Sequence, residues 1–278
     1  MQIDVIVPTY NRARSLTKAL DSVLNQTFKD LNLIVVDDGS TDDTLSVLDR
    51  YKHLKNVYIY TQDNNGVSSA RNLGVKKSQS PWISFLDSDD GWLPEKLELQ
   101  MSFLQNNPKL RFLHSEEIWV RNGIRVNPKI KHQKSNENIF FRSLDFCLIS
   151  PSTVVMRRDL FNECGPFDES FLVCEDYDLW IKILAKESIG FLSNYVTIKN
   201  GGHDDQLSTK YVAMDYWRIK SLANLIQKEK NLSPEQLIQI KSVLDKKSEV
   251  LLRGYIKHKN LDAYNEITSL LNSLIIYF

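Results

Sequence analysis

The sequence has few cysteines, no excess of charge and no long apolar run. The three cysteines of the 278-residue chain show no C-x-x-C spacing, so we expect neither a disulfide framework nor a zinc site. Lys plus Arg number 35 and Asp plus Glu also number 35, which argues against a general nucleic-acid-binding protein. No stretch reaches the roughly 18 apolar residues of a transmembrane segment, and no signal peptide opens the chain. These absences favour a cytoplasmic protein.

Two common nucleotide-binding signatures, G-x-G-x-x-G and G-x-x-x-x-G-K-[ST], are also missing. Residues 3–105 instead alternate between apolar runs, typical of strands buried on both faces, and segments with helical spacing. The apolar runs are "IDVIVPTY", "LNLIVVDD", "NVYIYTQ" and "WISFLD". We expect Pro8 to stop the first of them. This rhythm predicts an α/β fold with a mostly parallel central sheet.

The second half of the chain is less regular. An Asn-Gly turn at 122–123 predicts a hairpin, and the polar residues 127–138 predict a mobile loop. Beyond Ser208 only helices are expected, with an apolar stripe that forms either core or the seam of a homodimer; it comprises Leu237, Ile240, Leu244 and Leu251. We therefore divide the chain into a domain at 1–208, with halves 1–110 and 111–208, and a helical extension at 209–278.

Polar residues follow three of the four predicted strands, where ligands bind in open parallel sheets. They are Thr9, Tyr10 and Asn11; Asp37 and Asp38; and Asp87 and Asp89. One such site could be a turn, but three together indicate a binding site. Carboxylates this close repel unless a cation lies between them, and Mg²⁺ is usually held by one or two carboxylates and substrate phosphates. We therefore expect Mn²⁺ or Mg²⁺ at Asp87 and Asp89.

The ordered motifs resemble those of family 2 glycosyltransferases, which have the GT-A fold. They are "VIVPTYNR", "VVDDGSTDDT", "NNGVSSARNLG", "FLDSDDGWLPEKL" and "EDYDLWIK", and "GGHDDQLS" extends them. The resemblance covers about residues 3–185 and implies a single nucleotide-binding GT-A domain before the helical extension. It also implies a nucleotide-sugar donor, inversion at the anomeric carbon and a divalent cation.

The resemblance implies a role for each matching residue. The residues expected to bind the donor are Pro8, Thr9, Tyr10, Arg12, Asp38, Arg71, Asp87 and Ser88. The expected metal ligands are Asp89, Asp87 and His203. Arg71 would lie near the diphosphate or brace the aspartates. Asp176 would be the general base, with Glu175 beside it to orient the acceptor or brace the loop.

The resemblance implies that the protein transfers a sugar from a nucleoside-diphosphate donor, expected to be UDP-linked, to a hydroxyl of a glycan or lipid-linked acceptor in cell-surface polysaccharide synthesis. No nucleic-acid partner is expected, and the enzyme would associate peripherally with the inner face of a membrane. A sugar-1-phosphate nucleotidyltransferase is an alternative, although "PTYNRARS" lacks the glycine-rich loop such an enzyme would carry. A non-catalytic nucleotide-sugar-binding module is the second alternative.

Overall fold

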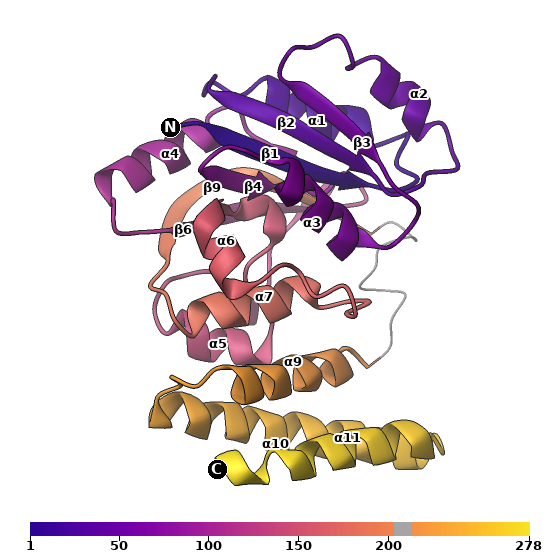
Figure 1. The fold of residues 1–278 in the computed structure, drawn as a ribbon, viewed down its shortest axis with the longest axis vertical. Helices are drawn as coiled ribbons and strands as arrows, with labels where there is room; N and C mark the ends of the chain where they lie inside the picture. The colour runs from indigo at the N-terminus through magenta and orange to yellow at the C-terminus, as the bar shows by residue number, and fades with distance from the viewer. Residues whose placement is uncertain (203–212) are drawn as a thin grey trace.

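The strands form one curved sheet whose first half is parallel. The computed structural model describes residues 1–202 and 213–278 (Figure 1). The strands are β1 (Ile3–Thr9), β2 (Leu31–Asp37), β3 (Val57–Thr61), β4 (Trp82–Phe85), β5 (Gly91–Trp92), β6 (Phe112–Arg121), β7 (Ile124–Val126), β8 (Val155–Arg157) and β9 (Gly190–Gly201). They pair in the order β3-β2-β1-β4-β8-β6-β9-β5, and β7 pairs with β6. The predicted α/β fold is confirmed: β3, β2, β1 and β4 are parallel, while β8 is antiparallel to both of its neighbours.

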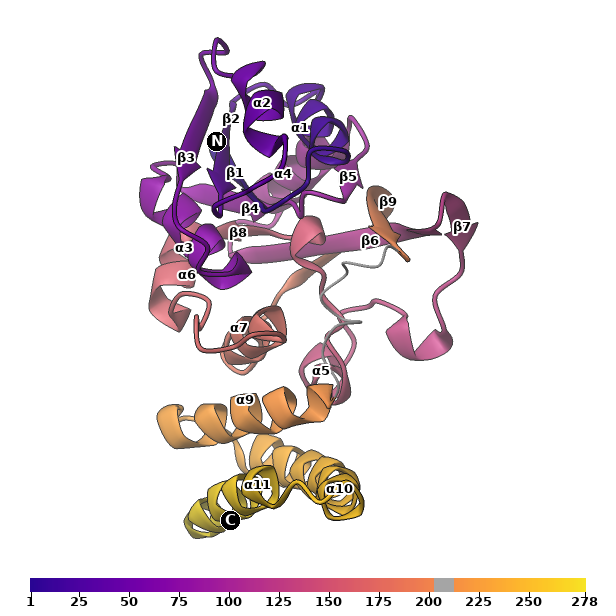
Figure 2. The same cartoon turned by 90° about the vertical axis from the view of Figure 1, so that its right-hand side faces the viewer.

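Helices cover both faces of this sheet. Those over one face are α1 (Leu16–Leu24), α2 (Thr44–Asp49) and α4 (Lys96–Asn106); those over the other are α3 (Val67–Lys77), α6 (Arg158–Cys164) and α7 (Glu175–Leu184) (Figure 2). Along β1, Val5 and Val7 pack in the core with α1 and α4, whereas Ile6 packs in the core with α3 and α7. This two-sided burial explains why the first strands read as continuous apolar runs.

Pro8 lies inside β1 rather than ending it, so that expectation was wrong. The pairing of β1 with β2 continues to Thr9, but its pairing with β4 ends at Ile6 and Phe85. The carbonyl of Ile6 accepts a hydrogen bond from the backbone of Leu86 on the β4 side. Pro8 is two residues after Ile6, so its backbone faces the same neighbouring strand. The N–H that proline lacks would therefore point to the β4 side, where pairing has already stopped. The strand therefore loses no ladder hydrogen bond.

Helix α3 lies unusually close to β1 because residue 74 is glycine. A Cβ at Gly74 would lie 2.4 Å from Cγ2 of Ile6, well inside van der Waals contact. Any other residue would push the helix away from the sheet. Gly74 therefore fixes the position of the preceding turn of α3, which carries Arg71.

The C-terminal residues form three helices packed on the rest of the chain. They are α9 (Met214–Lys228), α10 (Pro234–Lys257) and α11 (Leu261–Ser273) (Figure 1). Ser233 and Gln236 form the capping box that starts α10. Ile240, Leu244 and Leu251 of the predicted stripe are buried in the same core cluster as α7. The stripe is thus part of the core within one chain, and a homodimer and the 209–278 boundary stay predictions.

Strands β5 and β9, helix α5 (Ile139–Asp145) and the short 3₁₀ turns were not predicted. Strand β9 runs parallel to β6 and, through Thr197 and Ile198, antiparallel to the short strand β5. Helix α5 follows the expected loop, which itself contains a single 3₁₀ turn, η1 (Ile130–His132). Another 3₁₀ turn, η2 (Pro151–Thr153), precedes β8, and η3 (Ile275–Tyr277) follows α11. In the described ranges, no helix has the length and apolar character needed to cross a bilayer.

Candidate active site

The loops after β1 and β2 are tied together where both strands end. The backbone N–H of Asp38 donates to the carbonyl of Thr9 (2.8 Å). Asn11 adopts a positive φ of 52°, and its side-chain oxygen accepts the backbone N–H of Thr41 (2.7 Å). Tyr10, between them, remains 45% exposed. An exposed ring between two connected loops is accessible to a ligand, and the stacking of Tyr10 on a nucleotide base stays a prediction.

Asp38 is buried and its carboxylate holds a third loop. One oxygen accepts from Gln62 Nε2 (2.6 Å) and from the backbone N–H of Asn65 (3.0 Å). The other accepts from the backbone N–H of Gly66, which precedes α3 (2.8 Å). By contrast, Thr9 Oγ1 and Asp37 Oδ1 are buried without a hydrogen-bond partner in the described part of the chain; unmatched polar atoms of this kind fit a ligand pocket. The role of Asp38 toward the base stays a prediction.

Replacing Asp38 with alanine should raise the dissociation constant of the donor by about tenfold to a hundredfold, because a lost buried hydrogen bond costs roughly 1–3 kcal/mol. Calorimetric titration of the donor measures this directly, and the transfer rate at saturating donor should change little. Gln62→Ala is the matched control, since it removes only one bond that holds the loop. Unaltered donor affinity with a collapsed turnover number would contradict the assignment.

Arg71 joins the two acidic motifs of the sequence. Its guanidinium contacts Asp87 Oδ1 and Glu175 Oε1, each at 2.7 Å, and lies over the ring of Phe167 at 5.1 Å. The side chains of Arg71 and Glu175 are only 4% and 8% exposed. Burial and the neighbouring Asp176 raise the pKa of Glu175, and Arg71 opposes that rise. Of the two expectations for Arg71, bracing the acidic groups agrees with this geometry.

Arg71→Met should destabilise the fold by about 3–5 kcal/mol, because it leaves the Glu175 carboxylate buried without a partner. The contact with Asp87 counts for less, since that side chain is 31% exposed. Urea unfolding would measure the change. The double variant Arg71→Met/Glu175→Gln should recover part of the loss, because it removes the uncompensated charge as well. A single variant as stable as the wild type would show that the bridge does not hold these motifs.

The turn after β4 concentrates negative charge. Asp90 is buried, accepts from Ser152 Oγ (2.6 Å) and the backbone N–H of Asn200 (2.9 Å), and thereby fixes the turn. Burial raises its pKa well above the usual range, and the charges of Asp89 and Asp87 add to the effect. Ser88 is buried, whereas Asp87 and Asp89 are partly exposed. The carboxylates left on the open side of the turn are therefore Asp87 and Asp89.

These two carboxylates fit a divalent cation. In the part of the chain that the structure describes, no three His, Cys, Asp or Glu side chains are grouped for a metal ion. Two hard oxygen ligands are enough when the phosphates of a substrate supply others. The third predicted ligand, His203, lies outside the described residues. The backbone N–H of Arg12, a predicted donor-binding residue, donates to Thr44 Oγ1 (2.9 Å).

Asp176 lies at the start of α7, beside the anchored Glu175. One of its oxygens accepts the backbone N–H of Tyr177 (2.7 Å), and the other accepts from Cys147 Sγ (3.3 Å). Burial and the charge of Asp176 raise the pKa of Cys147 well above its usual range, so the thiol stays protonated and donates. The helix N-terminus favours an ionised carboxylate at this position. Asp176 is partly exposed, as a group that takes a proton from a substrate must be.

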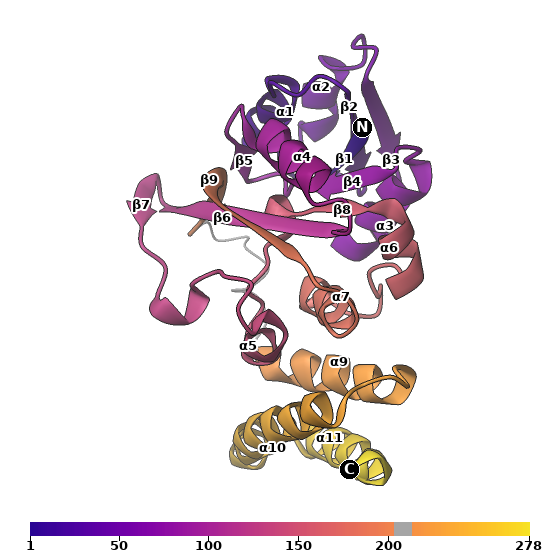
Figure 3. The same cartoon turned by 90° about the vertical axis from the view of Figure 1, so that its left-hand side faces the viewer.

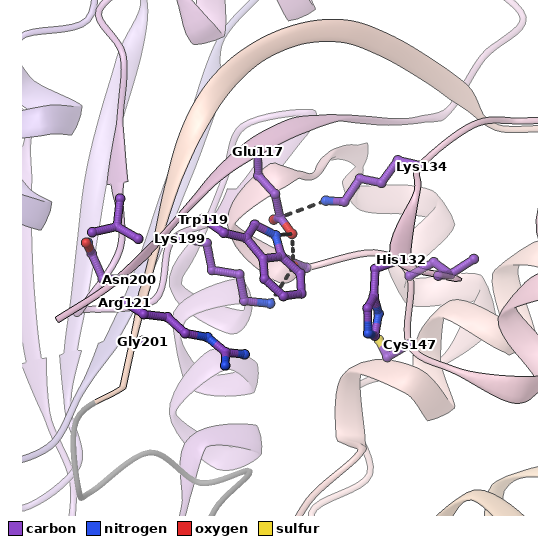
Figure 4. A pocket seen from close by; sticks show the side chains of 12 residues that line it. Glu117, Trp119, Arg121, His132, Lys134, Cys147, Lys199, Asn200 and Gly201 are labelled. Carbon is purple, nitrogen blue, oxygen red and sulfur yellow. Dashed lines mark hydrogen bonds and ion pairs between the residues drawn. The ribbon is translucent and has the colours of Figure 1, made fainter. Parts of the chain in front are cut away.

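A cavity of about 290 Å³ adjoins Asp176 through Cys147. Its lining residues are Glu117, Trp119, Val120, Arg121, His132, Lys134, Cys147, Leu148, Ser150, Lys199, Asn200 and Gly201 (Figure 4). Glu117 contacts Lys134 Nζ (3.0 Å) and accepts from Trp119 Nε1 (2.8 Å). Burial raises the pKa of Glu117, but the positive charges of Lys134 and Lys199 outweigh burial and lower that pKa to about 2. The cavity therefore contains one ionised acid among several cations.

Lys199, Trp119 and Glu117 are candidate functional residues that the sequence analysis missed. Lys199 Nζ donates to Ser150 Oγ (2.8 Å). Burial lowers the pKa of Lys199, but the negative charges of Glu117 and Asp90 outweigh it and raise that pKa above its usual range. The only local signal was a lysine within the β-branched run "VTIKN". Trp119 resembles any aromatic residue of a strand, so its place in the cavity could not be read from spacing.

Residues 4–165 match the model of the family described as Glycosyl transferase family 2. The chain belongs to glycosyltransferase family 2. An uncharacterized glycosyltransferase of Rickettsia bellii is 35% identical over 192 residues, covering 69% of this chain and 28% of that protein. The Escherichia coli UDP-Glc:alpha-D-GlcNAc-diphosphoundecaprenol beta-1,3-glucosyltransferase WfgD is 34% identical over 196 residues, covering 69% of this chain and 73% of that protein.

The fold comparison agrees with this family. A crystal structure of S. aureus TarS 1–349 in complex with UDP-GlcNAc superposes with a TM-score of 0.72 at 25% identity, covering 92% of this chain and 73% of that one. The expected GT-A fold is thereby confirmed. The family 2 chain spans about three-tenths of the length of the first curated relatives that it matches.

Proposed function

We propose that this chain transfers a sugar from a UDP-linked donor to a hydroxyl of a lipid-linked glycan, with inversion and with the help of Mn²⁺ or Mg²⁺. The observation that carries the proposal is the Arg71 bridge, which holds the aspartate turn after β4 next to the acidic start of α7. A donor-binding turn and a base for the acceptor are what a direct sugar transfer needs side by side.

The residues of the chain divide the chemistry between them. Asp176 takes the proton of the acceptor hydroxyl while the hydroxyl oxygen forms the new bond to the anomeric carbon of the donor sugar. The bond from that carbon to the diphosphate breaks, and the nucleoside diphosphate leaves with the electron pair. A cation held by Asp89 and Asp87 would offset the negative charge on this leaving group. Arg71 keeps Glu175 and Asp87 in place, so the turn that would bind the donor stays next to the acidic start of α7.

The cavity next to Asp176 is the proposed acceptor site. Trp119 offers a ring on which a sugar packs, and the cations Lys199, Lys134 and Arg121 suit an acceptor that carries phosphate. Residues 127–150 would take part in acceptor choice, because they supply five lining residues of the cavity: His132, Lys134, Cys147, Leu148 and Ser150. The relative WfgD is named for a sugar-diphosphoundecaprenol acceptor, which is the source of the lipid-linked proposal.

A donor panel tests the proposal. Nucleotide sugars are compared for thermal stabilisation with Mn²⁺, since binding stabilises the fold by the logarithm of ligand over dissociation constant. The stabilising donor is then incubated without acceptor, and slow release of nucleoside diphosphate is expected. Release of pyrophosphate from a nucleoside triphosphate and a sugar phosphate would instead support the nucleotidyltransferase alternative. Binding without release, even with lipid-linked sugar present, would support the non-catalytic one.

The same proposal puts the enzyme at the cytoplasmic face of a membrane. Its acceptor would be a membrane lipid, and its cysteines Cys147, Cys164 and Cys174 are all free thiols. Release of the enzyme from lysed cells by high salt, with no detergent, would agree with peripheral attachment. If the enzyme is released only by detergent and not by salt, peripheral attachment is wrong.

A further inference from the structure

A basic segment leaves the acceptor cavity and returns to it. Arg121 and His132 both line the cavity, and the chain between them forms the turn at 122–123, β7 and the start of η1. In Figures 2 and 3, β7 and the turn after it stand out from the side of the molecule beyond the end of β6. The segment, residues 121–131, is thus both a wall of the cavity and a projection of the surface.

Its charge is of one sign. It carries four exposed cations, Arg121, Arg125, Lys129 and Lys131, and no acidic residue. None of the four forms an ion pair within the ranges 1–202 and 213–278. The whole chain has no net charge, so this concentration is local. Arg121 lies over the ring of Trp119 at 6.0 Å and Lys131 over that of Phe146 at 4.5 Å, which hold the segment against the cavity.

Two isoleucines are exposed within the same segment. Ile124 is 70% exposed and Ile130 is 89% exposed. Each is next to a cation in the sequence, as "IR" at 124–125 and "KIK" at 129–131. Single exposed apolar residues are common on protein surfaces. Here, however, two of them lie within a segment whose charged residues are all basic. Such a surface combines charge for phosphate with apolar side chains for an acyl layer.

We propose that residues 121–131 dock on the surface of an anionic lipid bilayer, with Ile124 and Ile130 inserted between the headgroups and the cations bound to lipid phosphates. The inference rests on the proposed function, since docking there sets the mouth of the acceptor cavity against the membrane that holds a lipid-linked acceptor. Charge complementarity favours this partner, and the isoleucines favour it over a nucleic acid, which would need only the cations.

Vesicle flotation tests the docking. The wild-type chain should bind vesicles of phosphatidylglycerol and phosphatidylcholine in equal parts and should not bind vesicles of phosphatidylcholine alone. Salt at about 1 M should weaken binding, because it shortens the screening length to about 3 Å. No binding to the anionic vesicles, or equal binding to the neutral ones, would overturn the proposal.

Variants locate the contact. Lys129→Gln/Lys131→Gln should weaken vesicle binding by about tenfold or more, since each lysine near an anionic surface contributes about fivefold. Ile130→Ser should weaken it by about tenfold, through lost apolar burial. The matched controls are Lys257→Gln/Lys259→Gln, with the same charge change and spacing, and Ile238→Ser, at an isoleucine that is 66% exposed on α10. Controls that lose as much binding as the segment variants would refute the assignment to this segment.

Two further measurements separate this proposal from the others. Donor-induced thermal stabilisation with Mn²⁺ should be the same in the segment variants as in the wild type, which also shows that they fold. If no donor binds or turns over while vesicles still bind through Ile130, the proposed function fails and the docking surface stands. If a DNA duplex competes fully for the segment and Ile130→Ser changes nothing, the surface recognises charge alone and the bilayer proposal is wrong.

Discussion

Asp89→Asn is expected to abolish sugar transfer and to weaken donor binding only when a divalent cation is present. Asp89 follows β4 in the turn that Asp90 fixes to Ser152 and to the backbone of Asn200. With Asp87 already in contact with Arg71, Asp89 is the carboxylate proposed to bind the cation directly. Asparagine keeps the shape and one oxygen but removes the charge on which affinity for a hard divalent cation depends. Calorimetric titration of the donor, with and without Mn²⁺, gives both affinities.

Asp90→Asn is the matched control for this experiment. It makes the same chemical change one residue further on, at a carboxylate whose oxygens are both used inside the protein. We expect it to alter the stability of the fold and to keep the effect of Mn²⁺ on donor binding. If EDTA leaves the activity of the wild-type enzyme untouched, the cation role of the "DSDD" turn is wrong. The same conclusion follows if Asp89→Asn and Asp90→Asn lose the metal effect equally.

The first half of the fold could be predicted because its signals are local. Strands β1, β2 and β4 are short apolar runs buried on both faces, whereas the edge strand β3 is only partly buried; helices α1 and α3 carry their own periodicity or motif. The polar ends of β1, β2 and β4 meet by the rule for parallel sheets, which placed Thr9, Asp38 and Asp87 at one edge. The family motifs supplied the roles, which the residues alone could not.

The rest of the site depends on contacts between distant parts of the sequence. Arg71 and Glu175 are 104 residues apart, and neither motif shows that its partner is the other. Strand β9 is defined by its pairing with β6 and β5, and its residues "FLSNY" have no clear alternation. The cavity joins β6, β9 and the region before η2, so Trp119 and Lys199 become neighbours only after the sheet has formed.

Asp176→Asn is expected to slow transfer by about a hundredfold to ten-thousandfold, the usual contribution of a positioned base. Donor and cation should still bind with near wild-type strength, because among the described residues Asp176 forms its hydrogen bonds with Tyr177 and Cys147 and not with the turn after β4. Asparagine preserves the acceptor for the N–H of Tyr177 and removes the ability to take a proton, together with the acceptor for the Cys147 thiol. The measurement is a pair, donor titration with Mn²⁺ and the rate of transfer to lipid-linked sugar.

Glu175→Gln is the comparison that assigns the base to one of two neighbouring acids. Glutamine keeps an oxygen for the guanidinium of Arg71, so the bridge to Asp87 should survive in weakened form. Glu175 is 8% exposed and already paired, which leaves it poorly placed to reach a substrate hydroxyl, and its replacement should cost less activity than Asp176→Asn. If Asp176→Asn instead retains more than about a tenth of the wild-type rate, the general base lies elsewhere. Glu175 would then be the next residue to test, since Arg71 opposes the rise in its pKa that burial and Asp176 cause.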